Sequence, residues 1–104
     1  MAEKKHDVVV CIVNAGLSQN VMEAARGAGA KGGTILRARG SAHPEAEDFF
    51  HITVQPDKEV VLILVPSDIK DAVMKAVYKD AGVGTEAKGF IFSLPVSRTT
   101  DIKE

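Results

Sequence analysis

Two apolar runs constrain the fold of this 104-residue chain more than any other feature. "VVVCIV" covers residues 8–13, and "EVVLILV" covers residues 59–65. Both runs have the length and the β-branched content that are typical of strands. Because successive side chains of a strand point to opposite faces of the sheet, an unbroken apolar run places apolar side chains on both faces. We therefore predict a sheet that needs to be covered on two sides.

Two helices are predicted, one after each apolar strand. "LSQNVMEAARGAG" (17–29) has an apolar stripe at helical spacing, with Ser18 as the candidate N-cap. "SDIKDAVMKAVYKDAG" (67–82) begins with Ser67 as a candidate N-cap, has Ala72 and its neighbours on an apolar stripe, and ends at Gly82 in the C′ position. Further strands are predicted over 34–39 and 89–96. The order βαββαβ is ferredoxin-like, an α+β fold whose two helices lie on one face of an antiparallel sheet.

The other face of this sheet then needs a partner. If about five large apolar side chains faced water, the lost burial of roughly 1.5–3 kcal/mol each would rival the stability of a whole domain. Copies of the same chain are the simplest cover, so we predict a homo-oligomer. Long loops or the C-terminal tail are the alternative cover.

Composition excludes several classes of protein. A net charge of −1 gives no electrostatic footprint for nucleic acid. The single cysteine, Cys11, lies in an apolar run, which predicts a buried thiol and fits a reducing compartment. The sequence has neither a signal-peptide pattern nor an apolar segment of about 20 residues, so we expect a cytoplasmic protein that does not insert into membranes. It also lacks the motifs of common catalytic sites, and we predict that it is not an enzyme.

"GAGAKGG" (27–33) contains the pattern G-x-G-x-x-G of dinucleotide-binding turns. That turn follows a strand and opens a helix, whose N-terminus holds the pyrophosphate. Here the predicted helix comes before the glycines and a strand comes after them. We therefore expect these glycines to end a helix, without a phosphate site of the dinucleotide kind.

Three longer stretches resemble the PII nitrogen-regulatory signalling proteins: "GGTILRARG", "EVVLILVPSDIKDAVMKAV" and "AGVGTEAKGFIFSLPVSR". The likeness covers almost the whole chain. It implies a single domain over residues 1–104 that forms a homotrimer, with the sheets around a threefold axis. It also implies an adenine nucleotide, ATP or ADP, bound between subunits as a ligand, and leaves a role for magnesium open. Through a mobile T-loop, such a protein regulates a target protein, either a transporter or a metabolic enzyme.

The resemblance assigns roles to three segments: a T-loop-like connection over 40–57, a B-loop-like turn over 81–89 and a C-terminal tail over 97–104. Lys58 aligns with a lysine that helps to hold the small-molecule effector 2-oxoglutarate. Thr85 stands where the family has a glycine, and Asp101 stands where it has a phosphate-binding arginine. The connection lacks a tyrosine, so uridylylation there is not available. The nucleotide-binding residues that the resemblance implies are Thr34, Arg39, Gly40, Leu64, Gly82, Gly84, Thr85, Glu86, Lys88, Arg98 and Lys103.

A trimeric metal-binding protein of the CutA kind is the alternative, since it shares this architecture. His6, His43 and His51 are its candidate ligands. None of them has ligand-like spacing to another histidine or to Cys11. A metal site would therefore need one histidine from each of three subunits.

Overall fold

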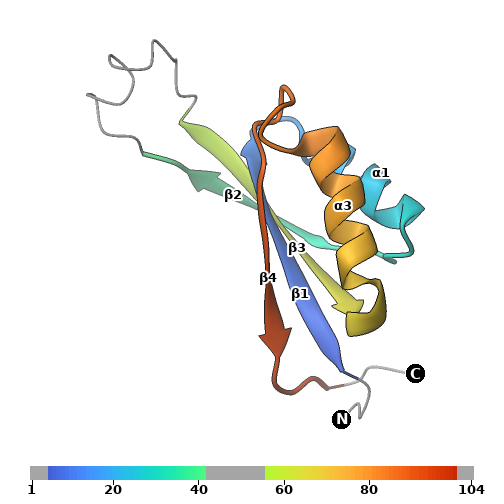
Figure 1. Cartoon of the computed structure of the whole chain (residues 1–104). Helices are drawn as coiled ribbons and strands as arrows, with labels where there is room; N and C mark the ends of the chain where they lie inside the picture. Colours follow the sequence, from blue (N-terminus) through green and yellow to red (C-terminus); the bar gives the residue numbers. More distant parts are fainter. Residues whose placement is uncertain (1–4, 42–55, 101–104) are drawn as a thin grey trace.

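The computed structural model describes residues 5–41 and 56–100 (Figure 1). The predicted order of elements is confirmed. The elements are β1 (His6–Asn14), α1 (Ser18–Gly27), β2 (Thr34–Arg39), β3 (Asp57–Pro66), the 3₁₀ turn η1 (Ser67–Ile69), α3 (Lys70–Ala81) and β4 (Phe90–Val96).

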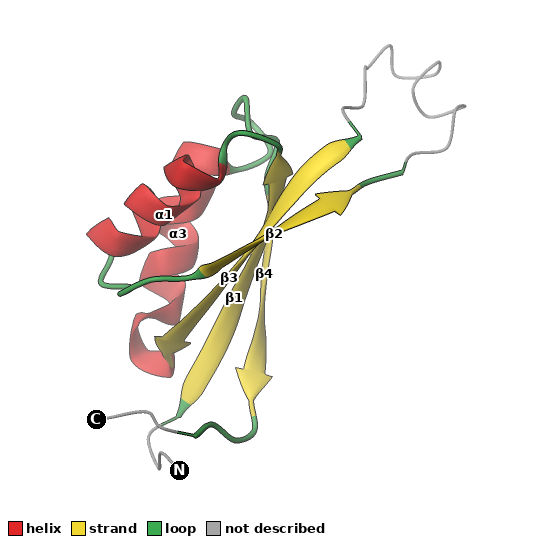
Figure 2. Ribbon diagram, turned by 180° about the vertical axis from the view of Figure 1, so that it is seen from behind, coloured by secondary structure: helices red, strands yellow, loops and turns green. Residues whose placement is uncertain are grey.

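The four strands form one antiparallel sheet in the order β2-β3-β1-β4. β1 and β3 are central, and Asn14 at the end of β1 pairs with Lys58 near the start of β3. Both helices lie on the same side of the sheet, as Figure 2 shows from behind. The predicted ferredoxin-like α+β fold is therefore confirmed.

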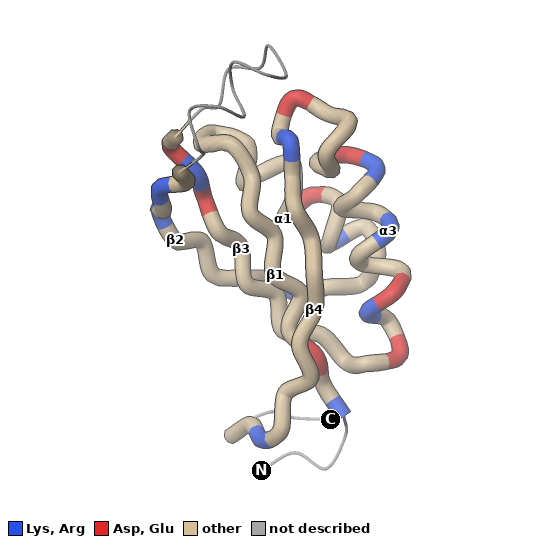
Figure 3. The backbone as a smooth tube through the Cα atoms, turned by 60° about the vertical axis from the view of Figure 1, so that its left-hand side comes forward, with Lys and Arg blue, Asp and Glu red and all other residues tan. Residues whose placement is uncertain are grey.

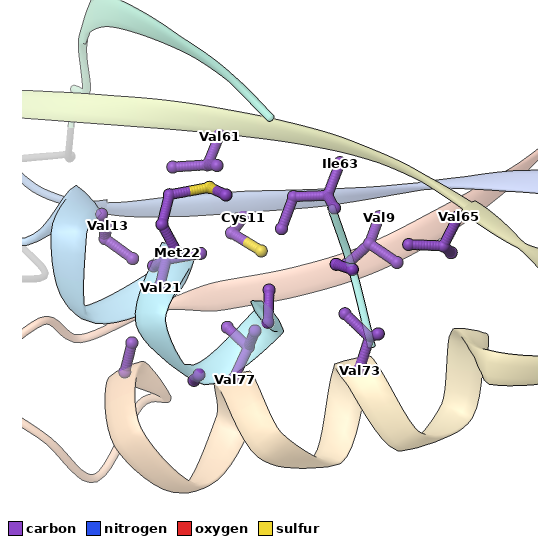
Figure 4. Close-up of a cluster of buried hydrophobic side chains, with 14 of the residues drawn as sticks. Val9, Cys11, Val13, Val21, Met22, Val61, Ile63, Val65, Val73 and Val77 are labelled. Carbon is purple, nitrogen blue, oxygen red and sulfur yellow. The ribbon is translucent and has the colours of Figure 1, made fainter. Parts of the chain in front are cut away.

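The hydrophobic core lies between the sheet and the two helices. Alternate side chains of the central strands point toward α1 and α3 and interlock with their apolar stripes (Figure 4). Cys11 is one of them, and its burial raises the pKa of the thiol to about 12. The prediction of a buried cysteine is thus confirmed. The fully buried side chains of this core include Val9, Cys11, Val13, Val21, Val61, Ile63, Val65, Val73 and Val77.

The opposite face of the sheet is apolar as well. The intervening residues of the strands point there, and the register brings Leu64 and Leu94 to either side of Val8. The described helices leave this face uncovered (Figure 1). Leu94 is 52% exposed and Phe90 is 65% exposed. The two-sided apolar character predicted for the central strands is therefore present, and we call this surface the open face.

The glycines after α1 end the helix, as predicted. The N–H of Gly29 donates to the carbonyl of Arg26 and the N–H of Ala30 donates to that of Ala25, both at 3.0 Å. Together with the positive φ of Gly29 (110°), these two bonds form a Schellman motif. β2 follows at Thr34, so the polarity is the reverse of a dinucleotide-binding turn.

The predicted helix starts were wrong at both serines. Ser18 is already helical, Leu17 takes the N-cap position, and no side-chain cap is present. Ser67 opens the 3₁₀ turn, and its N–H donates to the Lys5 carbonyl. In both cases a contact from another part of the chain replaces the local cap; for α1 that contact is a carboxylate of β3, described below.

The end of α3 also differs from the prediction. Gly82 is the C-cap residue with extended backbone (φ −76°, ψ −171°), so it does not adopt the left-handed conformation expected for a C′ glycine. Glycine is needed there because a Cβ atom would collide with the carbonyl oxygen of Tyr78. Ala72 is exposed, because α3 buries Val73, Val77 and Ala81.

Candidate functional site

Three segments meet at one end of the sheet. They are the β1–α1 turn (14–18), the start of β3 and the turn between α3 and β4 (82–89), and they lie near the root of the 40–57 connection (Figure 1). Figure 3 shows basic residues on β2 beside residues of both signs at the start of β3. The site is therefore built from parts of the chain that are far apart in sequence.

Asn14 connects two of these segments through its side chain. The Lys58 ammonium donates to Asn14 Oδ1 at 2.6 Å, and Asn14 Nδ2 donates to the Glu86 carbonyl at 3.1 Å. The backbone N–H of Asn14 also donates to the Ala87 carbonyl at 2.9 Å. The last residue of β1 thus holds β3 on one side and the 82–89 turn on the other.

Glu59 fastens the β1–α1 turn from the helix side of the sheet. Its Oε1 atom accepts hydrogen bonds from the backbone N–H of Gly16 at 2.8 Å and of Ser18 at 3.4 Å. The bond from Gly16 is the main reason that the pKa of Glu59 is lowered. Desolvation, the second-largest effect, opposes it, and the bonds from Ser18 and the charge of Arg37 lower the pKa further. Gly16 has a φ of 91°, a backbone conformation that glycine adopts easily and that residues with a side chain rarely adopt.

The turn over 82–89 is organised by Thr85. Its hydroxyl donates to the Gly82 carbonyl at 2.8 Å and accepts from the N–H of Ala87 at 3.2 Å. The N–H of Lys88 donates to the Thr85 carbonyl at 3.1 Å. Lys88 has a φ of 52° although it is not glycine, so its side chain is presented from a left-handed backbone. A Cβ atom on Gly84 would meet nothing within 4 Å, which leaves that part of the turn open to a ligand.

The root of the connection lies beside Lys58. The N–H of Gly40 donates to the Pro56 carbonyl at 2.7 Å. A Cβ atom on Gly40 would lie 3.2 Å from Lys58 Cε, so the lysine stem runs along this backbone. An open pocket of about 320 Å³ adjoins this point. It carries two cationic and two carboxylate side chains, and its lining residues are Ala15, Gly16, Arg37, Ala38, Asp57, Lys58 and Glu59.

The remaining residues implied by the resemblance lie elsewhere in the single chain. Thr34 is at the far end of β2 from Arg39, paired with Leu62, and Leu64 pairs with Val8 on the open face. β4 runs away from the 82–89 turn, so Arg98 follows its distant end. Lys103 lies outside the described residues. One chain therefore brings Lys58, Gly40 and the 82–89 turn to the same end, and keeps Thr34, Leu64 and Arg98 apart from them.

Sequence reasoning missed the roles of Asn14 and Glu59; Glu59 was placed only at the start of the 59–65 strand. The sequence does contain a signal for these roles. Polar residues end one apolar strand and begin the other, and the first of these strand ends lies close to the turn glycine Gly16. For a metal, the described residues hold no group of three or more His, Cys, Asp or Glu side chains placed to bind one. His43 and His51 lie outside the described residues.

The family model for "Nitrogen regulatory protein P-II" matches residues 6–104. The chain belongs to this family. Among solved structures, it is similar to the PII protein of Arabidopsis thaliana bound to citrate, with 28% identity, a TM-score of 0.67, and coverage of 91% of this chain and 78% of that chain. A protein of Thermus thermophilus described as PII-like has the same fold, with a TM-score of 0.62, 15% identity and coverage of 89% of each chain. No curated protein matched the sequence.

Membership of the P-II family confirms the resemblance seen in the sequence. P-II proteins are regulatory and non-enzymatic, which is consistent with the prediction made here. The comparisons give no support to the CutA-like alternative. In the parts of the chain that the structure describes, none of the helices has the length and apolar character needed to cross a membrane.

Proposed function

We propose that this P-II protein is a cytoplasmic nucleotide sensor. ADP or ATP binds between the subunits of a homotrimer, and the bound state is passed to a transporter or a metabolic enzyme through the 40–57 connection. The observation that carries this proposal is that the Asn14 side chain hydrogen-bonds both the 82–89 turn and Lys58, beside the root of that connection. A ligand at the turn thus binds next to the segment that contacts the target.

The open face supports the trimer. It presents apolar side chains from both central strands and from the edge strand β4, and their exposure to water is unfavourable. When three copies bury this face around an axis, residues that are distant within one chain come close to a neighbour. Thr34, Leu64 and Arg98 of one subunit then complete the site at the turn of the next.

The 82–89 turn supports phosphate binding. Gly84 leaves the backbone accessible, and Lys88 supplies a positive charge from an exposed position. Thr85 keeps the turn in shape through its own hydrogen bonds. Glu86 stands where the family has aspartate, and Gly82 supplies the close backbone approach to α3. Arg39 and Gly40 bound the site on the side of the connection, and Lys103 adds a second charge from the tail.

Lys58 is the proposed contact for a small anionic effector. Its ammonium has donors left after the bond to Asn14, since it carries three N–H groups. The Arabidopsis PII structure contains citrate, a carboxylate ligand of a related protein. We propose a carboxylate such as 2-oxoglutarate as the effector class.

Calorimetry with ATP, ADP, AMP and cyclic AMP, with and without magnesium, tests the proposal. We expect one adenine nucleotide per subunit and a weaker affinity of about tenfold in Lys88→Ala, because one charged contact is lost. Lys79→Ala, an exposed lysine on α3, is the matched control and should bind as the wild type does. If none of these nucleotides binds, the sensor proposal is wrong.

A further inference from the structure

The side chain of Asn14 joins the two halves of the proposed site. We propose that Asn14 is a positioning residue that energetically links the 82–89 turn to Lys58, so that a change at one alters ligand affinity at the other. The inference rests on the proposed function, because it names how two parts of the same site communicate.

The chemistry of the partners fixes the orientation of the Asn14 amide. An ammonium group only donates hydrogen bonds and a backbone carbonyl only accepts them. Oδ1 must therefore face Lys58 and Nδ2 must face Glu86, as the structure has them. A flipped amide would lose both bonds at once. An amide at residue 14 can serve both partners, whereas a carboxylate would keep Lys58 and repel the Glu86 carbonyl.

The backbone of Asn14 is held in place, so the side chain acts as a fixed link. Asn14 pairs with Lys58 across β1 and β3, and its N–H is bonded to the Ala87 carbonyl. Displacement of the turn therefore changes the bond from Nδ2 to Glu86, and through the same amide it changes the bond to the ammonium. The stem of Lys58 in turn lies against Gly40, at the root of the connection.

Two neighbouring sites are coupled only if some part of the protein can adopt two arrangements and ligands at the two sites favour different ones. Lys58 provides them. Its ammonium is held by Asn14 in the free chain, and an anionic ligand competes for the same charge. When the ammonium leaves, the Asn14 side chain keeps only its bond to Glu86, and the side-chain link between the turn and Lys58 is lost.

A double-mutant cycle on ADP affinity tests this link. Asn14→Ala and Lys58→Met should each weaken ADP binding by about tenfold, and the double variant should be no weaker than either alone, because both substitutions break the same link. Losses that multiply to about a hundredfold would show that Lys58 acts on the nucleotide without Asn14, and would overturn the proposal. Asn20→Ala, an exposed asparagine of α1, is the matched control.

A second measurement needs no nucleotide. NMR exchange rates with water report on the amides of Thr85 and Lys88, which are hydrogen-bonded within the turn. Lys58→Met should accelerate their exchange several-fold in the free protein, whereas Lys79→Met should leave it unchanged. Unchanged rates in Lys58→Met would overturn the link. If ADP fails to bind the wild-type protein while these rates do change, the sensor proposal is wrong and the link through Asn14 stands.

Discussion

The carboxylate of Glu59 accepts a hydrogen bond from the backbone N–H of Gly16 at 2.8 Å. This bond joins β3 to the turn that leads into α1 and replaces the side-chain cap that Ser18 was predicted to supply. The preceding residue, Lys58, holds Asn14 at the other end of the same turn. Two consecutive residues of one strand thus hold residues 14–18 from opposite faces of the sheet.

Glu59→Gln should lower the free energy of unfolding near neutral pH by about 0.5 kcal/mol, because a partly exposed carboxylate is largely screened by solvent. The lowered pKa of Glu59 means that its charge stabilises the fold above the ordinary carboxyl pKa of 4.5. This contribution is lost as the pH falls through the folded-state value. Urea unfolding of both proteins across this range should show the two stabilities converging in acid. A constant difference at every pH would contradict the role of the charge.

Gly82→Ala should destabilise the protein by about 2 kcal/mol, because the new Cβ atom would press on the Tyr78 carbonyl and force the end of α3 to move. Gly84→Ala in the same turn is the matched control. Nothing lies within 4 Å of its Cβ position, so we expect a change within about 0.5 kcal/mol. Thermal or urea unfolding measures both. Equal effects of the two substitutions would mean that the turn does not need close approach at Gly82.

Two substitutions at Lys88 distinguish the effect of backbone strain on stability from the effect of the side chain on ligand binding. Its φ of 52° disfavours any residue with a Cβ atom, so Lys88→Gly should be more stable than Lys88→Ala by about 1 kcal/mol. Both variants lose the side-chain charge, and both should bind ADP about tenfold more weakly than the wild type. Unfolding and calorimetry on the same samples give the two quantities. An Ala variant as stable as the Gly variant would argue against the strain.

Leu94→Asp should break the proposed trimer. Leu94 is 52% exposed on the open face, and a carboxylate there would be buried without a partner in the assembly. Sedimentation velocity should show a shift from trimer toward monomer. Tyr78→Lys is the control, because Tyr78 is 59% exposed on the helical layer and should leave the assembly intact. A trimer that persists in Leu94→Asp would place the subunit contact elsewhere.

The fold could be predicted because its signals are local. The apolar runs around Val9 and Ile63 defined the central strands, and the glycines after α1 defined the end of that helix. The site could be predicted only in part. Asn14 and Glu59 contact residues that lie between 41 and 72 positions away in the sequence. Such contacts follow from the strand register, which no single stretch of sequence contains, and the same holds for the contacts that replace the serine caps.

The position of Lys58 and Glu59 has an evolutionary consequence. Both residues follow Asp57 on β3, where the register with β1 and β2 is already set. Insertions or deletions between Gly40 and Pro56 therefore leave these two anchors where they are. Relatives can therefore differ in the length and sequence of that segment while they keep both anchors; under the proposed function, this would change the target without changing the ligand chemistry at its base.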